Sequence, residues 1–323
     1  MSAAPRVWIL GDGRIGHAVP MIGVAERAGW AYDLRQVAPR KPFELLAPFG
    51  PIDPAEGPAR TGSPLAPPYP DICMASGRRT IPYLRHLKRV SPDTFTVLFR
   101  MPRTARHGAD LIVVPEHDGF EARNSISIPV LPHRFSPERL AKARTAPPPT
   151  LAALPHPRIA VLIGGDSRHH KFTTADTARL TKGLRDLADS GAGLMVTLSR
   201  RTPAALAAAL THLGGAENVF VWDGSGDNPL TAMLALADSI VATADSTNMV
   251  GEAAATGRPI HLFHPTGGHA KMTRYYDILS KSAVIRPFPG EIGGAPYPPL
   301  DPTDQVAGEI LMRFHACRPR KTA

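Results

Sequence analysis

Residues 158–171 have the sequence Arg158-Ile-Ala-Val-Leu-Ile-Gly-Gly-Asp-Ser-Arg-His-His-Lys171, in which an apolar run passes directly into a polar turn with two glycines. A short apolar run that ends in turn residues favours a buried strand. The same arrangement stands near the start of the chain, where Arg6-Val-Trp-Ile-Leu10 passes into Gly11-Asp-Gly-Arg-Ile-Gly-His17. A buried strand, a glycine-rich turn and a helix open a doubly wound α/β domain. Because this opening occurs twice, the sequence predicts two such domains in tandem.

Apolar runs and helix signals alternate through the rest of the chain. In the first half we expect helices over 19–28 and 80–90, and strands over 31–37, 71–75, 94–99 and 110–114. In the second half we expect strands over 194–198, 219–222, 239–243 and 259–263, and a terminal helix over 303–314. Thr173-Thr-Ala-Asp176 resembles a capping box that opens the first helix of this half. The alternation predicts parallel strands that are joined by crossovers.

Two proline-rich stretches interrupt this pattern. We expect residues 39–70 to form a surface excursion and residues 145–157 to link the domains. The predicted domains are therefore an N-terminal domain at 1–150, a second domain at 156–302, and a C-terminal helix and tail at 303–323 that packs back on the first. Open parallel sheets bind ligands at the carboxyl ends of their strands. We therefore expect the polar turns of both domains to face a central cleft.

The composition sets further limits. Residues 1–150 hold 20 Lys and Arg against 13 Asp and Glu, a net +7, while residues 151–323 hold 17 against 15, a net +2. A basic first half favours anionic partners, which are phosphates, acidic lipids or nucleic acid, with a plain composition bias as the alternative. Neither a signal peptide nor an apolar run of the ~18 residues that a membrane span needs is present. We expect a cytoplasmic protein, which can also be peripheral at the inner face of the membrane.

Charged residues on the helix expected over 80–90 suit that peripheral location. Arg85, His86, Lys88 and Arg89 accompany apolar residues there. Such a helix suits an anionic membrane or a lipid phosphate, and the alternative is an ordinary helix with one buried face. The two cysteines, Cys73 and Cys317, have no metal-site spacing, so no metal is expected.

The first glycine-rich turn offers a candidate base. The turn matches the motif G-x-G-x-x-G of dinucleotide-binding folds. Such a fold needs an acidic residue about 20 residues farther on, and residues 36–42 contain none, which disfavours a dinucleotide site. We expect an acceptor or phosphate loop formed by Gly11, Gly13, Arg14 and Gly16, together with Arg78 from the turn after strand 71–75. His17 is the candidate general base and Asp12 the second choice, because histidine titrates near neutrality. A structural histidine is the alternative.

Four turns of the second half are candidates for binding a nucleotide. Gly164, Gly165, Asp166 and Ser167 form a turn that suits a pyrophosphate, with a solvated turn as the alternative. Arg200 follows strand 194–198 and suits phosphate oxygens, and the alternative for this turn is a helix start capped by Thr202. Lys271 closes the cationic turn 265–271, which suits a sugar or phosphate contact.

The strongest pattern lies in residues 237–261. Strand 239–243 delivers Asp245, Ser246 and Thr247 to a helix start, where hydroxyls and free amides meet phosphates. Glu252, on the same helix, can accept the hydroxyls of a ribose. An exposed helix residue is the alternative for Glu252 alone.

These residues resemble a known signature. Residues 237–259 resemble the nucleotide-binding segment of peptidoglycan N-acetylglucosaminyltransferases, with Glu252 at that family's ribose-binding position and Asp245-Ser246 in place of Arg-Ser-Gly. The 164–167 turn is similar to that family's Gly-Gly-Ser turn. Residues 220–223 resemble the segment whose backbone meets the uracil, which adds Trp222 to the candidate site.

Outside residues 39–70, the chain resembles bacterial relatives of the plant elongated-mitochondria fission factor. The motifs that carry this resemblance are Gly11–His17, Ala75–Arg79, Ile163–Phe172, Ser199–Thr202 and Ala244–Met249. It implies the GT-B fold, in which two Rossmann-like doubly wound domains face a cleft. It also implies a metal-independent glycosyltransferase that moves a sugar from a nucleotide-sugar donor, UDP-linked, to a hydroxyl of a lipid or cell-envelope glycan. No cofactor besides this donor substrate and no nucleic-acid partner is expected. A non-catalytic adaptor of the same fold and a sugar-nucleotide epimerase or hydrolase stay open as alternatives.

Overall fold

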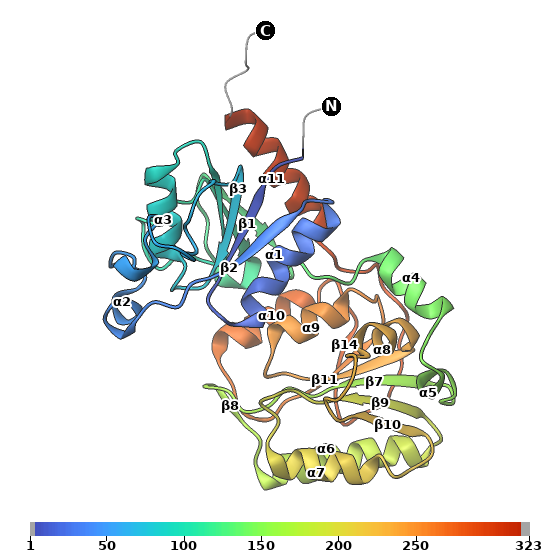
Figure 1. The fold of residues 1–323 in the computed structure, drawn as a ribbon. Helices are drawn as coiled ribbons and strands as arrows, with labels where there is room; N and C mark the ends of the chain where they lie inside the picture. The colour runs from blue at the N-terminus through green and yellow to red at the C-terminus, as the bar shows by residue number, and fades with distance from the viewer. Residues whose placement is uncertain (1–3, 318–323) are drawn as a thin grey trace. The chain divides into compact units, whose positions relative to one another are not determined.

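The computed structural model describes residues 4–317, which divide into two units (Figure 1). The first unit contains the residues up to Arg134 and those from Asp301 onward, and the second contains Phe135–Leu300. Within the described residues each unit is built on one six-stranded sheet whose neighbouring strands are all parallel. The expected doubly wound α/β architecture is thus present twice.

The first sheet has the strand order β2-β1-β3-β4-β5-β6. Its strands are β1 (Val7–Gly11), β2 (Tyr32–Gln36), β3 (Ile72–Ser76), β4 (Phe95–Phe99), β5 (Leu111–Pro115) and β6 (Ser125–Ile128). Val7 pairs with Tyr32 on one side and with Ile72 on the other. The strand order therefore reverses at β1, because β2 is added on one side of it and β3 on the other. In open parallel sheets ligands bind at such a switch point, and the turn that follows β1 begins at Asp12.

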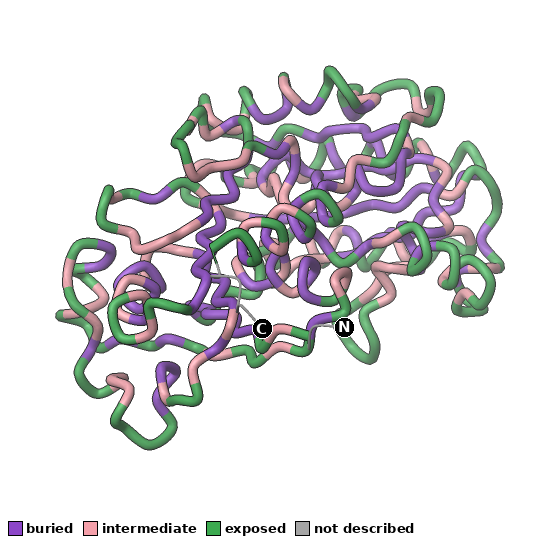
Figure 2. Tube along the Cα trace, turned by 90° about the horizontal axis from the view of Figure 1, so that it is seen from above, coloured by how far each residue is buried: buried purple, intermediate pink, exposed green. Residues whose placement is uncertain are grey.

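Helices cover both faces of this sheet. On one face α1 (Ile15–Arg27) and α11 (Thr303–Cys317) pack together and share a core with Val7 and Ile9. On the other face α3 (Ile81–Val90) covers the intervening residues of β1, which are Trp8 and Leu10. This alternation follows from the two-residue period of a strand, and both sets are buried because helices lie on both sides. Figure 2 shows the buried strands in purple and many outer helical turns in green.

The C-terminal helix α11 belongs to the first unit. Val306, Ile310 and Phe314 recur at four-residue spacing and are buried in its core. Arg27 of α1 donates hydrogen bonds to Asp301 at 2.7 Å and to Asp304 at 2.6 Å, which fixes the entry to α11.

The proline-rich stretch 39–70 is only partly the surface excursion that we expected. It is mostly irregular, apart from α2 (Lys41–Leu46) and a 3₁₀ turn, η1 (Pro54–Glu56). Leu65, however, is fully buried in the core beneath α3. Asp53 is also buried, where it pairs with Arg40. The expectation was wrong at these positions and also at Ala47 and Ser63, which are buried, because single residues scattered among prolines give no periodic signal.

The second sheet has the strand order β10-β9-β7-β11-β12-β14. Its strands are β7 (Arg158–Leu162), β9 (Gly193–Thr197), β10 (Val219–Trp222), β11 (Ser239–Thr243), β12 (Ile260–Phe263) and β14 (Ile285–Pro287). Its helices are α6 (Thr174–Asp189), α7 (Ala204–Leu213), α8 (Leu230–Leu236), α9 (Thr247–Ala254) and α10 (Ala270–Leu279). In Figure 1, α6 and α7 lie on one face of this sheet, and α8, α9 and α10 lie on the other. Thr173 and Asp176 form the predicted capping box of α6.

Residues 145–157 are not the linker that we expected. Two helices, α4 (Pro137–Thr145) and α5 (Pro149–Ala152), precede β7, and α4 packs against α8. Arg144 donates a hydrogen bond to the carbonyl of Ala235 at 2.8 Å. The boundary therefore lies at residues 134/135 rather than near 150, since these contacts place α4 and α5 in the second unit.

The remaining predicted strands and helices are confirmed to within a few residues, whereas β6, β14, one short ribbon and the helices α2, α4, α5, α8 and α10 were not predicted. This ribbon pairs β8 (His170–Lys171) with β13 (Thr266–Gly267) in antiparallel fashion. Within residues 4–317 there is no helix that is both long and apolar enough to cross a membrane.

Candidate functional site

In the second unit, three polar turns meet at one edge of the sheet. They follow β9, β7 and β11, which are neighbours in the sheet, so their carboxyl ends lie side by side. The turn after β9 contains Ser199 and Thr202, and the hydroxyls of both donate to the carbonyl of Gly164, at 2.8 and 2.6 Å. The last residue of β11 is Thr243, whose hydroxyl accepts the Gly164 amide at 2.8 Å. Residues far apart in the sequence thus hold one turn in place.

Asp245 is the centre of this arrangement. Its carboxylate accepts the Thr243 hydroxyl at 2.7 Å, the Gly165 amide at 3.0 Å and the Arg201 guanidinium at 2.8 Å. The carboxylate side chain is fully buried, while the side chain of Arg201 stays 44% exposed. We predicted that the backbone amides of 245–247 meet the pyrophosphate, which makes Asp245 a nucleotide-binding residue through its amide. The structure gives its carboxylate oxygens three partners inside the protein, so the side chain of Asp245 positions the turns around it.

Two glycines allow these turns to approach so closely. A Cβ at Gly164 would lie 2.2 Å from the Asp245 carboxylate, and one at Gly165 would lie 2.0 Å from the carbonyl oxygen of Arg201. Both distances are far below van der Waals contact. The glycines that we assigned to phosphate approach are therefore required for packing within the protein.

The amides of residues 164–167 were expected to meet a pyrophosphate, and the structure does not leave them available. Besides the two amides already described, the Asp166 amide donates to the carbonyl of Arg201 at 3.1 Å and the Ser167 amide to that of His170 at 2.9 Å. The Asp166 carboxylate pairs with Lys171 at 2.9 Å. The hydrogen bond from Lys171 and a second from the Phe172 amide lower the pKa of Asp166. The amides of this turn therefore stabilise the fold of the loop and are not free to bind a pyrophosphate.

Adjacent arginines after β9 have different roles. Arg201, which the sequence did not single out, donates to Asp245 and also to the carbonyls of Gly165 and Asp166. Arg200, which it did, is exposed. Trp222 ends β10, one strand farther out, where it pairs in register with Thr197 of β9. Its indole N–H donates to the carbonyl of Ser225 at 2.8 Å.

The N-terminal half of α9 carries the remaining nucleotide candidates. Ser246 caps the helix, with its hydroxyl 3.5 Å from the Met249 amide, and Thr247 is the first helical residue. Glu252 lies about one and a half turns farther along the same helix. It is half-buried, and none of the hydrogen bonds among the described residues involves its carboxylate. Burial raises the pKa of Glu252 to about 7. A carboxylate with unfilled acceptor sites beside a helix N-terminus suits a ligand that carries hydroxyls and phosphates.

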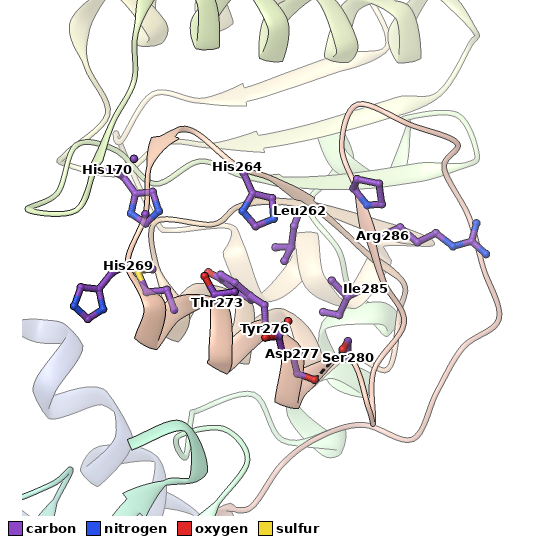
Figure 3. A pocket seen from close by; sticks show the side chains of 14 residues that line it. His170, Leu262, His264, His269, Thr273, Tyr276, Asp277, Ser280, Ile285 and Arg286 are labelled. Atoms are coloured by element: carbon purple, nitrogen blue, oxygen red, sulfur yellow. Dashed lines mark hydrogen bonds between the residues drawn. The ribbon is translucent and has the colours of Figure 1, made fainter. Parts of the chain in front are cut away.

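A cavity of about 370 Å³ opens between α10 and the ends of β12 and β14 (Figure 3). His170, His264 and His269 line it from the loops, and Thr273 and Asp277 line it from α10. The β8–β13 ribbon joins the loops that follow β7 and β12 at its margin.

Two buried groups of this cavity are Tyr276, which connects it to the turn after β11, and the ring of His170. Tyr276, which also lines it, donates its hydroxyl to the Ala244 carbonyl at 2.8 Å, one residue before Asp245. The Nδ1 atom of His170 is buried without a hydrogen-bond partner. Lys271 is the second residue of α10, and its amide donates to the ring of His269, which lines this cavity.

In the first unit, the turn after β1 brings Asp12 and His17 together. The Nδ1 atom of His17 lies 3.0 and 3.1 Å from the two carboxylate oxygens of Asp12. The Asp12 side chain is only 4% exposed, whereas that of His17 is 22% exposed. Burial alone would raise the pKa of Asp12, but the hydrogen bond and charge of His17 outweigh it and lower that pKa. A buried carboxylate that holds one ring nitrogen leaves the other nitrogen of the imidazole to act as a base.

The turn after β3, which contains Gly77 and Arg78, lies next to the Asp12–His17 pair. Gly77 follows β3 with a φ of +96°, and a Cβ there would lie 2.8 Å from His17 Nδ1 and 2.9 Å from an Asp12 oxygen. Arg78 is directed away from the pair, since its guanidinium donates to the carbonyl of Ala47 at 2.8 Å.

The glycine-rich loop itself is closed by its own contacts. The Gly13 amide donates to the Gln36 side chain at 2.9 Å, and the Arg14 amide donates to Asp12 at 3.3 Å. Gly11 packs against the same glutamine, which would lie 2.8 Å from a Cβ at that position, while Gly16 belongs to the first turn of α1. Gln36 ends β2, where a dinucleotide site requires an acid. The amides of Gly13 and Arg14, which we expected to meet phosphate, thus already donate hydrogen bonds within the protein.

Sequence reasoning missed several residues that hold the candidate site. Those with long-range partners are Gly77, Ser199, Arg201, Thr202, Thr243 and Tyr276, whereas the buried atoms Ser76 Oγ and His170 Nδ1 have no hydrogen-bond partner among the described residues. Most of them lie within motifs that the sequence did show, Ala75–Arg79, Ile163–Phe172 and Ser199–Thr202, but nothing in the sequence indicated their contacts or distinguished Arg201 from Arg200. Among residues 4–317, no three His, Cys, Asp or Glu side chains gather as a metal site would require.

Known proteins resemble this chain in sequence and in fold. The mitochondrial fission protein ELM1 of Arabidopsis thaliana is 28% identical over 275 residues, which are 76% of this chain. This chain spans 64% of the length of that relative. Among solved structures, a putative UDP-N-acetylglucosamine 2-epimerase of Listeria monocytogenes matches with a TM-score of 0.55 at 13% identity, over 98% of both chains. UGT89C1 of Arabidopsis thaliana, complexed with UDP, matches with a TM-score of 0.52 at 14% identity, over 99% of this chain and 92% of that one.

At such identities a structural likeness shows the fold alone, and it confirms the GT-B class that we expected. The sequence comparison goes further, because the model of the family described as Mitochondrial fission ELM1 matches residues 15–314. This match extends from the first turn of α1 almost to the end of α11, and so includes both units. The chain therefore belongs to the mitochondrial fission ELM1 family.

Proposed function

We propose that this chain is a glycosyltransferase that moves a sugar from a UDP-linked donor to an acceptor hydroxyl, without a metal or cofactor of its own. The observation that carries this proposal is the Asp12–His17 pair, because a fold by itself does not imply catalysis. An imidazole that is held by a buried carboxylate and remains partly exposed is the arrangement that a general base requires. An adaptor has no use for it.

In the proposed reaction His17 is the base. Asp12 accepts the Nδ1–H of His17, which leaves Nε2 to take the proton of the acceptor hydroxyl. The acceptor oxygen then forms a bond to the anomeric carbon while the bond from that carbon to the diphosphate breaks. The leaving UDP carries away the electron pair, and the Asp12 carboxylate stabilises the imidazolium that forms.

In the second unit, we assign the donor to α9 and the turns beside it. Glu252 accepts the ribose hydroxyls, and the first amides of α9, at Ser246 and Thr247, meet the diphosphate. Arg200 and Lys271 stabilise the charge of the leaving group. Trp222 lies at the uracil, and the cavity beneath α10 accepts the sugar. The 164–167 turn does not contact the donor in this proposal but holds the neighbouring turns in place, because its amides donate hydrogen bonds within the protein.

UDP is the first nucleotide to test, because the Arabidopsis neighbour of the same fold is complexed with UDP. The acceptor hydroxyl belongs to a lipid or a cell-envelope glycan in this proposal. The net +7 of residues 1–150 supports an acceptor that carries phosphate.

Calorimetry with UDP and UDP-sugars tests the donor site. The wild type is expected to bind, and no binding of any uridine nucleotide by the wild type would refute the proposal. His17→Ala is expected to retain binding and to lose turnover, measured as UDP release with a lipid or glycan acceptor. If UDP-sugar is consumed at the wild-type rate without any acceptor, the epimerase or hydrolase alternative replaces the transferase. If the wild type binds UDP but shows no turnover with any substrate, the result supports the adaptor alternative.

A further inference from the structure

A groove of about 660 Å³ lies on the first unit, between residues 49–54 and one face of α3. Pro82, Arg85 and Arg89 line it from successive turns of the helix, and Arg106 closes it from the loop between β4 and β5. None of its lining residues is acidic. The groove is therefore a basic feature, and it is separate from the residues that the proposed reaction uses.

Positive charge in this groove has no carboxylate partner among the described residues. Arg85 donates only to backbone carbonyls, including those of Phe49 and Arg106, at 3.2 and 3.0 Å. Arg89 contacts the ring of His86 at 3.0 Å. Burial lowers the pKa of Arg85, and the charges of Arg106 and Arg89 lower it further. These cations repel one another, and an anion in the groove would relieve that repulsion.

The acids of the neighbouring segments already have partners. Glu44 of α2 pairs with Arg79, and Asp53 pairs with Arg40. Glu56 accepts the hydroxyl of Tyr83. The charge of the groove is thus left for a partner from outside this chain.

Apolar side chains project from the segment beside the groove. The short helix α2 buries none of its residues. Leu45 is 76% exposed, Leu46 54% and Phe49 70%, although side chains of this size are commonly buried. Phe49 lines the groove, and the Leu46 side chain packs against Gly50, which also lines it. The apolar segment and the arginines therefore form one continuous surface.

This combination favours a membrane over a protein partner. A stable protein interface needs about 800 Å² from each partner with an apolar centre, and three apolar side chains supply far less. A bilayer surface presents phosphates within a few ångströms of its acyl chains, so it matches basic and apolar groups that lie side by side. We propose that the segment 45–49 and the arginine groove dock the first unit on an anionic phospholipid surface. Arg89 and Arg106 bind lipid phosphates, and Leu45, Leu46 and Phe49 enter the interface.

Vesicle sedimentation of the full chain tests this surface, with phosphatidylcholine vesicles compared with mixed phosphatidylglycerol–phosphatidylcholine vesicles. The wild type is expected to sediment only with the anionic vesicles and to be released by salt. R89Q/R106Q is expected to bind them roughly 25-fold more weakly, because each arginine near an anionic surface contributes about fivefold. L45S/F49S is expected to bind at least about tenfold more weakly. R123Q/R139Q removes the same charge from exposed positions elsewhere and serves as the matched control.

Three outcomes would overturn the proposal. The wild type does not sediment with anionic vesicles, the control variant loses as much binding as R89Q/R106Q, or L45S/F49S binds as well as the wild type. All substituted positions are exposed, so thermal melts that match the wild type are expected to show intact folding. Calorimetry with UDP on the same variants separates this inference from the proposed function. Unchanged UDP binding with lost sedimentation supports docking, whereas absent UDP binding in the wild type refutes only the transferase.

Discussion

Replacing Glu252 by Gln removes a half-buried carboxyl group whose pKa burial raises from 4.5 to about 7. Between these two values the folded chain keeps a proton that the unfolded chain releases. The wild type therefore loses stability as the pH rises through this window. A pKa difference of this size corresponds to about 3 kcal/mol at pH 8 and to less than about 1 kcal/mol at pH 5. The first figure is an upper limit, because the carboxyl is not fully enclosed.

We expect Glu252→Gln to stabilise the protein by about 2–3 kcal/mol at pH 8 and hardly at pH 5. Urea unfolding at the two pH values measures this. UDP affinity is expected to fall roughly 10- to 100-fold in calorimetry, because hydrogen bonds to a charged acceptor contribute about 1.5–3 kcal/mol. Glu217→Gln is the matched control, since Glu217 is exposed in the same unit.

Equal stabilities of variant and wild type at both pH values would refute the environment that we describe for this carboxyl. A stability gain at pH 8 with unchanged UDP affinity would keep that environment and remove the role in ribose binding. A gain of similar size in Glu217→Gln would point to net charge rather than to burial. The experiment thus separates a local cost in stability from a general electrostatic effect.

Three further substitutions or conditions test the surrounding structure. Gly77→Ala places a Cβ 2.8 Å from His17 Nδ1 at a φ of +96°, so it is expected to abolish turnover while calorimetric UDP affinity stays within about twofold. Asp245→Asn is expected to destabilise the protein by about 2–3 kcal/mol in urea unfolding, because it weakens charged hydrogen bonds to Arg201 and Gly165, whereas Arg200→Gln should leave stability unchanged. Burial lowers the pKa of His261 from 6.5 to about 4, so the unfolded chain binds a proton here that the folded chain does not. In Glu252→Gln, which lacks the opposing titration of Glu252, stability should therefore fall by about 3 kcal/mol as the pH drops from 6.5 to 4, and a flat profile would contradict this assignment.

Local patterns determine much of this fold, and the sequence shows them directly. Buried parallel strands such as β7 and β11 are continuous apolar runs, so their position could be predicted to within a residue or two. The missed strands lack that signal. β14 is three residues long and ends in proline, and β6 alternates serine with isoleucine at the edge of its sheet. Their pairing depends on neighbouring strands rather than on their own composition.

Candidate site residues were harder to assign because their roles depend on distant partners. The hydrogen bond that joins Gly165 to Asp245 connects residues 80 positions apart. A sequence shows that an aspartate follows a strand, but it does not show which donors the fold brings to that aspartate. For the same reason Arg200 and Arg201 are equivalent in sequence, although only the second has an ion pair with Asp245.

Three carboxylates of this chain illustrate how surroundings decide which group is left for a ligand. Asp245 is buried with three donors around it, and Asp12 is buried with His17 and an amide as its donors. Both are satisfied by the protein itself, so folding alone accounts for their burial. Glu252 is half-buried, and no described side chain or amide donates to it, so its burial costs stability at neutral pH. A packing role would be served better by an uncharged residue. The cost is explained if a ligand supplies the missing donors, and a ribose with two neighbouring hydroxyls is a ligand of that kind.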